Sequence, residues 1–213
     1  MDVETTFLFI VEVIGTIAAA ISGIRMAASK RFDWFGAYSV GLVTAIGGGT
    51  LRDILLGIPV FWMQTWWYLA VTGLSLLVVI LFQKLLLHTR ILFIFDTVGL
   101  ALFVDIGIQK SLAAGYPIWV AIVMGIITGA LGGVLRDIVL NQEPLLFKKD
   151  FYATACLIGG LVYWAVLLMG GSVPAQCLIC AATVILIRVL AVRYGWSLPH
   201  MKEAIDENMD IEN

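Results

Sequence analysis

The chain has 213 residues, of which 61% are hydrophobic and only 13% are charged, with a net charge of −2 and a mean hydropathy of +1.00. Soluble domains are typically about 45–50% apolar, with glycine counted, and about 25% charged. This composition excludes a soluble enzyme, a disordered chain and a nucleic-acid-binding protein, and it predicts an integral membrane protein.

Seven apolar segments have about the 20 residues that a helix needs to cross a bilayer. Short polar or aromatic joints separate them, so the sequence predicts one all-α membrane domain over residues 1–193, followed by an acidic tail at 194–213. In chain order the predicted spans are Thr5–Ala28, Phe35–Leu56, Trp66–Leu87, Ile91–Lys110, Ile118–Leu140, Phe151–Gly170 and Val173–Val192.

Lysine and arginine residues are distributed unequally between the two sides of these spans. Seven spans place only Lys110 on the side of the N-terminus. Because cytoplasmic loops accumulate basic residues, the N-terminus is predicted outside and the tail in the cytoplasm, with the bacterial inner membrane as the expected location. The cytoplasmic side would hold Lys30, Arg31, Lys84, Arg90, Lys148, Lys149, Arg193 and Lys202.

The sequence contains an internal repeat: when it is shifted by 84 residues (132 − 48 = 84), its first half aligns with its second half. Residues 48–54, Gly-Gly-Thr-Leu-Arg-Asp-Ile, fall on residues 132–138, Gly-Gly-Val-Leu-Arg-Asp-Ile. Each copy contains three spans, an odd number, so the second copy crosses the membrane in the opposite direction. Two inverted three-helix repeats are an architecture of transport proteins. Repeat one covers about 5–87 and repeat two about 90–170, and the seventh helix at about 173–192 stands outside them.

Spans two and five each carry a glycine cluster, followed within one turn by an arginine and an aspartate. Glycine weakens a helix by about 1 kcal/mol relative to alanine, and irregular backbone at membrane depth is tolerated only where it is buried in protein or lines water. We therefore expect both spans to be bent or broken and to line a polar cavity. Close packing of the two spans is the alternative, and both interpretations can hold together. The residues are Gly47, Gly48, Gly49, Arg52 and Asp53 in repeat one, and Gly132, Gly133, Arg136 and Asp137 in repeat two.

Charged residues inside a bilayer usually mark a functional path, and mutual ion pairing is the structural alternative. We favour a functional role for the two arginines and a structural one for the two aspartates that follow them. Adjacent residues on a helix point about 100° apart, so each arginine is expected to find its partner on another helix rather than in the next residue.

Other polar residues inside the spans are equivalent under the repeat. Glu12 and Asp96 are expected to counter the arginines, and the hydroxyls of Thr44 and Thr128 to face the same cavity as the glycine clusters. Arg25 and Arg188 have the positions of membrane anchors, and neither is assigned a transport role. Cys177 and Cys180, in a C-x-x-C spacing without other ligands, indicate packing rather than metal binding.

The doubled glycine–Arg-Asp motif in seven spans resembles the TRIC family, the trimeric intracellular cation channels, in its prokaryotic branch, and is similar to proteins with the bacterial glycine-transporter domain. The resemblance implies a homotrimer in which each protomer has its own pore for potassium or sodium ions, between bent spans two and five. It also implies that the glycines, arginines and aspartates of both motifs line or shape that pore.

Three functions remain open from the sequence. The first is a passive monovalent cation channel, the second a secondary transporter of a small amino acid such as glycine, and the third a membrane scaffold. The chain contains no G-x-x-x-x-G-K-[ST] loop, which disfavours ATP-driven transport. We expect no enzymatic activity, cofactor, resident metal or nucleic-acid partner, and we expect contacts with permeating ions and membrane lipid.

Overall fold

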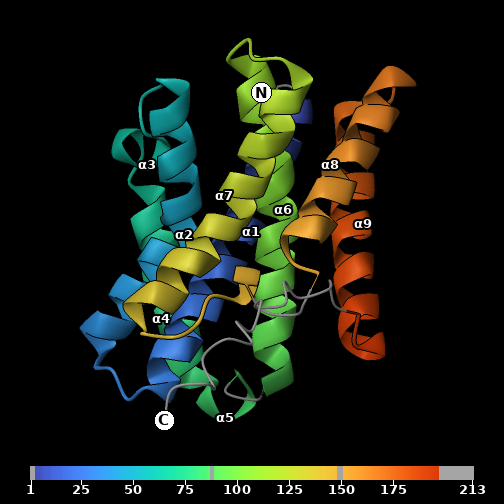
Figure 1. Cartoon of the computed structure of the whole chain (residues 1–213). Coiled ribbons are helices and arrows are strands. Elements are labelled where there is room, and N and C mark those ends of the chain that lie inside the picture. Colours follow the sequence, from blue (N-terminus) through green and yellow to red (C-terminus); the bar gives the residue numbers. More distant parts are fainter. Residues whose placement is uncertain (1–2, 87–88, 148–150, 197–213) are drawn as a thin grey trace, which may run out of the picture.

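The computed structural model describes residues 3–86, 89–147 and 151–196. These residues are almost entirely helical and contain no strand (Figure 1). The predicted acidic tail and the basic residues Lys148, Lys149 and Lys202 lie outside the part described. The elements are α1 (Val3–Ser29), α2 (Trp34–Leu56), α3 (Phe61–Gln64), α4 (Trp67–Leu81), α5 (Gln83–Leu86), α6 (Thr89–Ala113), α7 (Ile118–Val139), the 3-10 turn η1 (Leu145–Phe147), α8 (Ala153–Leu168) and α9 (Val173–Tyr194).

Five of these helices, α1, α2, α6, α7 and α9, are long and apolar enough to cross a membrane. The other two apolar helices are shorter than predicted, with 15 residues in α4 and 16 in α8. At 1.5 Å per residue they extend over about 23 Å, against about 30 Å for the hydrocarbon core. The backbone of Phe82, with φ −107° and ψ 29°, interrupts the third predicted span and separates α4 from α5.

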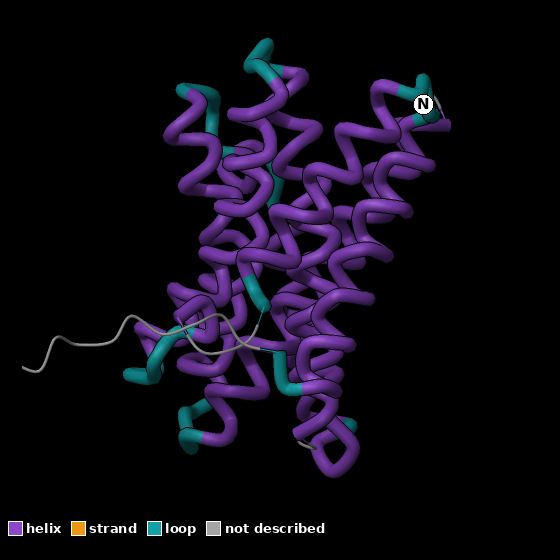
Figure 2. The backbone as a smooth tube through the Cα atoms, turned by 45° about the vertical axis from the view of Figure 1, so that its right-hand side comes forward, coloured by secondary structure: helices purple, strands orange, loops and turns teal. Residues whose placement is uncertain are grey.

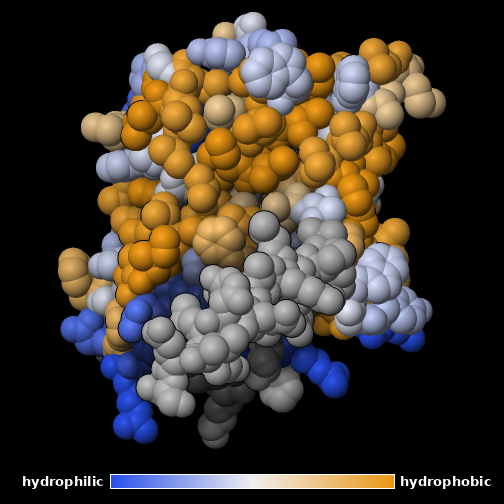
Figure 3. Space-filling view, viewed as in Figure 1, coloured by the Kyte–Doolittle hydropathy of each residue, from blue (hydrophilic) through white to orange (hydrophobic). Residues whose placement is uncertain are grey.

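The helices run along a common direction (Figure 2), and their outer face is hydrophobic over the middle of the molecule (Figure 3). Large apolar side chains such as Ile54, Leu77 and Leu186 are 56–60% exposed, which in a soluble protein would be costly. A bilayer removes that cost. The chain is therefore an all-helical integral membrane protein.

Two groups of three helices pack in the same way. Helices α1, α2 and α4 contact one another, and α7 contacts α6 and α8, which also touch each other. The groups meet through α1 against α6 and α2 against α7, while α9 packs against α6 and α8. The helices with the glycine clusters, α2 and α7, therefore meet at the contact between the two groups.

The crossing of α2 and α7 is a contact between backbones. A Cβ atom at Gly48 would collide with the carbonyl oxygen of Thr128, and one at Gly132 with that of Thr44. Both helices continue without a break through their glycine clusters, so the expectation of a broken helix is wrong. Close packing is confirmed, because glycine lets the two backbones touch and tertiary contacts outweigh its weak helix propensity.

Local signals place the Arg-Asp motif near the end of α2. The helix starts after Asp33, whose carboxylate accepts a hydrogen bond from the Gly36 N–H at 2.7 Å. It ends at Gly57, which caps the helix with φ 67°, a left-handed conformation that glycine adopts without strain. Asp53 thus lies one turn from a sharp change in chain direction.

The crossing predicts a strong effect of Gly48→Ala. The added methyl would meet a backbone atom rather than a flexible side chain, and we expect a loss of roughly 1–3 kcal/mol of stability. Thermal unfolding of the detergent-solubilised protein measures the change. Gly73→Ala in α4 is the matched control, since the nearest atom to its Cβ, in Tyr38, is 3.8 Å away. Equal melting temperatures for the two variants would contradict the backbone contact.

Candidate functional site

Each arginine of the doubled motif pairs with the aspartate that follows it. Arg52 Nε donates to Asp53 Oδ1 at 2.8 Å, and Arg136 Nε donates to Asp137 Oδ1, also at 2.8 Å. All four side chains are buried. The expectation that neighbouring residues would not pair is therefore wrong. The arginine side chain is long enough to reach the carboxylate of the next residue although the two residues point in different directions from the helix.

The second oxygen of each aspartate holds the chain that follows the helix. Asp53 Oδ2 accepts from the Phe61 N–H at 2.9 Å, and Asp137 Oδ2 accepts from the Leu145 N–H at 3.0 Å. These two acceptors are equivalent under the repeat, since 145 − 61 = 84. Each aspartate thus fixes both its arginine and the returning loop.

Asp96, on α6, connects this helix to α7 of the second repeat and to α9. Its Oδ1 lies 2.7 Å from Arg136 Nη1 and its Oδ2 lies 3.0 Å from Arg188 Nη1. Arg136 Nη1 also donates to Ser22 Oγ on α1 at 2.6 Å. The expected pairing of Asp96 with Arg136 is confirmed.

Arg188 is not the membrane anchor that the sequence indicated. It is buried on α9, and its guanidinium lies 4.4 Å from the ring centre of Tyr152 and 5.2 Å from that of Phe93. Its position, about one turn inside a predicted span rather than at its edge, was the only signal in the sequence. The sequence could not show which carboxylate pairs with Arg188, because Asp96 is 92 residues away along the chain.

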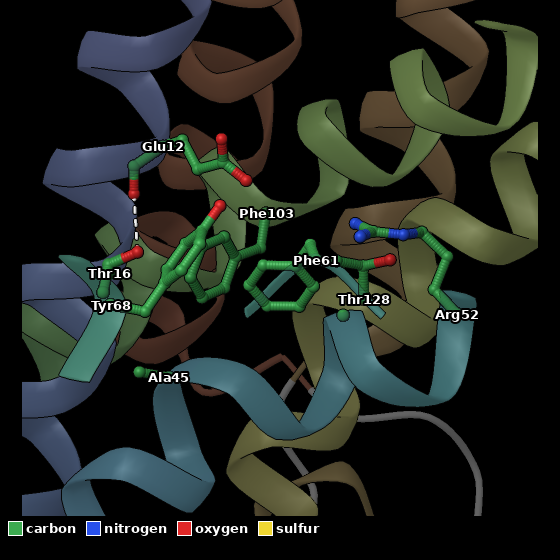
Figure 4. Close-up of a pocket in the computed structure, with 9 residues that line it drawn as sticks. Glu12, Thr16, Ala45, Arg52, Phe61, Tyr68, Phe103 and Thr128 are labelled. Carbon is green, nitrogen blue, oxygen red and sulfur yellow. Dashed lines mark hydrogen bonds between the residues drawn. The ribbon is translucent and has the colours of Figure 1, made fainter. Parts of the chain in front are cut away.

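Glu12, the counterpart of Asp96, has a different partner. Its Oε1 accepts from Lys110 Nζ at 2.9 Å, and the side chains in this pair are 18% and 32% exposed. The Lys110 ammonium also lies 4.9 Å from the ring centre of Phe61. Glu12 lines the same cavity as Arg52 (Figure 4) but pairs with Lys110, so its expected pairing with that arginine is not what the structure shows.

Two small cavities, each with room for about one water molecule, lie beside the α2–α7 crossing. The repeat relates several of their residues, such as Gly49 to Gly133 and Tyr68 to Tyr152. We call them the outer and inner cavities, after the predicted orientation. The outer cavity is lined by Glu12, Thr16, Ala45, Gly49, Arg52, Phe61, Tyr68, Phe103 and Thr128. The inner cavity is lined by Ala19, Ser22, Thr44, Asp96, Gly99, Leu100, Phe103, Gly129, Gly133 and Tyr152.

Each cavity is built from both repeats. Thr128 of repeat two lines the outer cavity and Thr44 of repeat one lines the inner cavity, so the two threonines face separate spaces instead of a shared one. Each hydroxyl donates to its own helix, at 2.6 Å to Val40 O or Met124 O, which leaves an oxygen lone pair for a cation or water. Gly47, Gly48 and Gly132 form the contact between the helices and line neither cavity.

Comparison with known proteins places this geometry in a family. The family model described as "Glycine transporter" matches residues 9–84 and 93–167, two segments that start 84 residues apart (93 − 9 = 84). A solved structure of the TRIC trimeric intracellular cation channel orthologue from Rhodobacter sphaeroides matches with a TM-score of 0.84 and 30% identity, over 89% of this chain and 99% of that one. The chain belongs to the prokaryotic branch of the TRIC family.

Other members of the family are similar along nearly their whole length. The UPF0126 inner membrane protein YadS of Escherichia coli is 40% identical over 202 residues, which cover 92% of this chain and 96% of that protein. The UPF0126 membrane protein YvgT of Bacillus subtilis is 35% identical, over 92% of this chain and 98% of its own length. A prokaryotic TRIC channel structure in 0.5 M KCl is 31% identical with a TM-score of 0.82, and it covers 91% of this chain and 100% of that one.

The two carboxylates that the repeat relates predict unequal effects on stability. Asp96→Asn removes the charge that two buried guanidiniums share, and we expect a loss of roughly 3–5 kcal/mol. Glu12→Gln breaks a partly exposed pair, and we expect at most about 1 kcal/mol. The two variants are compared by heating each in detergent and measuring, by size-exclusion chromatography, how much protein stays monodisperse. Similar losses would show that the second repeat does not depend on its buried ion pairs.

Proposed function

We propose that this protein is a monovalent cation channel, for potassium or sodium ions, with a conduction path between α2 and α7 in each protomer of a homotrimer. The observation that carries this proposal is the pair of repeat-related cavities on either side of the α2–α7 crossing. Relatives also support the proposal, since three solved proteins of the family that are 30–31% identical to this chain are TRIC cation channels.

The charges along this path do not oppose cations as strongly as two arginines alone would. Arg52 is paired with Asp53, and Arg136 and Arg188 share the carboxylates of Asp137 and Asp96. The charges of each set cancel. Between the paired charges the cavities offer the oxygens of threonine, serine and backbone groups, which are the ligands that channels use in place of water.

We also propose the finer arrangement that the sequence predicts. In it, α4 with α5 and the shorter α8 complete seven crossings as two inverted three-helix repeats, with the N-terminus outside and the tail in the cytoplasm. The repeated contacts of the three-helix groups and the matched Arg-Asp geometry support this layout. The ion path would be shaped by the glycines, arginines and aspartates of both motifs, with Glu12 and Asp96 as supporting charges and Thr44 and Thr128 as oxygen ligands.

A carrier for glycine fits the geometry less well. A substrate carboxylate would need a free guanidinium, but Arg52, Arg136 and Arg188 each already hold an aspartate. Glycine has five non-hydrogen atoms, whereas each cavity has room for about one water molecule. A potassium ion needs a smaller expansion of the same space.

Purified protein in a planar bilayer under a potassium chloride gradient tests the proposal directly. We expect step-like currents that reverse near the potassium equilibrium potential. Saturable uptake of labelled glycine into proteoliposomes, in the absence of such currents, would overturn the channel and favour the carrier.

The arginines give a second test. We expect Arg52→Ala and Arg136→Ala each to change the single-channel conductance or its voltage dependence, because each removes a charge beside a cavity. Arg193→Ala, at an exposed position at the end of α9, is the control and should leave the currents unchanged. Wild-type currents in both motif variants, together with lower thermal stability, would show that the arginines serve only as structural ion pairs.

A further inference from the structure

The side chain of Phe103, on α6, lies between the two cavities. Among the residues that the structure describes, it is the one that lines both of them, and the residue is 8% exposed. In the outer cavity it lies beside the rings of Phe61 and Tyr68 (Figure 4). The ring also presses on α1, where a Cβ at Gly15 would come within 2.9 Å of Phe103 Cε1.

Phe103 is also where the repeat is broken. Its counterpart is Ala19, since 103 − 19 = 84, and Gly15 corresponds to Gly99. The pairing of Gly15 with Phe103 is thus repeated by Gly99 with Ala19, but the second pair has a methyl group where the first has a phenyl ring. A single aromatic ring therefore reaches the middle of a path that is otherwise built from two similar halves.

The surroundings of the ring are polar on both sides. The outer cavity offers Thr16, Thr128 and the charge of Glu12, and the inner cavity offers Ser22, Thr44 and Asp96. Phe103 has no hydrogen-bonding group and belongs to an apolar core cluster. A cation or water that moved from one set of oxygens to the other would lose its ligands at this ring.

We propose that Phe103 is the apolar gate of the conduction path, a residue that controls which molecules pass between the outer and inner cavities. This inference rests on the proposed function. Apolar constrictions stop ions because water leaves them, even where the opening is wider than the ion. The ring closes the path while it packs on Gly15, and a change in the distance between α1 and α6 would move it aside.

Potassium flux into proteoliposomes tests the gate. We expect Phe103→Ala and Phe103→Ser to raise the resting flux several-fold, with the larger increase for serine, because it removes the ring and also supplies a hydroxyl. Phe103→Leu keeps an apolar side chain and should stay near wild type. Phe9→Ala, at a residue of α1 that is 44% exposed, is the matched control for the loss of a ring elsewhere.

The two proposals fail in different ways. If wild type conducts and Arg52→Ala alters its currents, but Phe103→Ala and Phe103→Ser conduct like wild type, the gate is overturned and the channel stands. If wild type and every variant pass no ions while all remain folded, the proposed function itself is overturned.

The accessibility of introduced cysteines to silver ions tests the Phe103 barrier without any measurement of current. In a background in which the three buried cysteines are replaced, Thr16→Cys places a thiol in the outer cavity and Ser22→Cys one in the inner cavity. Silver ions, which are monovalent and bind thiols, are added on the side of the N-terminus, and protection from later alkylation is read by mass spectrometry. Adding Phe103→Ala should speed modification of Ser22→Cys, adding Phe103→Leu should leave its rate near that with the ring, and neither should change the rate at Thr16→Cys. Equal rates at Ser22→Cys with and without Phe103→Ala would overturn the gate.

Discussion

The backbone contact between α2 and α7 is the constraint on which the rest of the structure depends. Gly48 and Gly132 allow each helix to lie against a carbonyl oxygen of the other, at Thr128 and Thr44. A small cavity adjoins this crossing on each side, lined in part by Gly49 and Gly133 of the two glycine clusters. The arginines follow within one turn, so the same contact sets their positions beside those cavities.

The sequence predicted the parts of this arrangement that depend on local pattern. The shift of 84 residues located the two Arg-Asp motifs and the related spans, and apolar length located most of the helices, whereas the pairing within each motif and the division into two cavities were not predicted. Contacts that depend on side-chain reach were not accessible to it. Arg52 reaches Asp53 because its side chain is long enough to span the angle between neighbouring residues on a helix. Asp53 accepts a hydrogen bond from the Phe61 N–H because the chain turns after Gly57. Phe103 gave no signal, since one phenylalanine in an apolar helix is common.

The two three-helix groups are stabilised differently, although the contacts among their helices correspond. Asp96 is enclosed with Arg136 and Arg188, so that salt screens its charge much less than that of an exposed carboxylate. Glu12 and Lys110 are partly exposed, with side chains 18% and 32% accessible. The ion pairs are therefore more enclosed in the half that contains Asp96 than in the half that contains Glu12.

This difference traces to α9, a helix that neither repeat encodes, because it supplies Arg188 to the second half alone. A path made of two identical inverted halves would present the same mouth to ions from either side, and its current would depend only on the size of the voltage. Here the side of Glu12 has a partly exposed ammonium–carboxylate pair, whereas the side of Asp96 has two buried guanidiniums paired with aspartates. In a channel of the proposed kind, the two entrances would differ for a cation, and that difference would come from the helix outside the repeats.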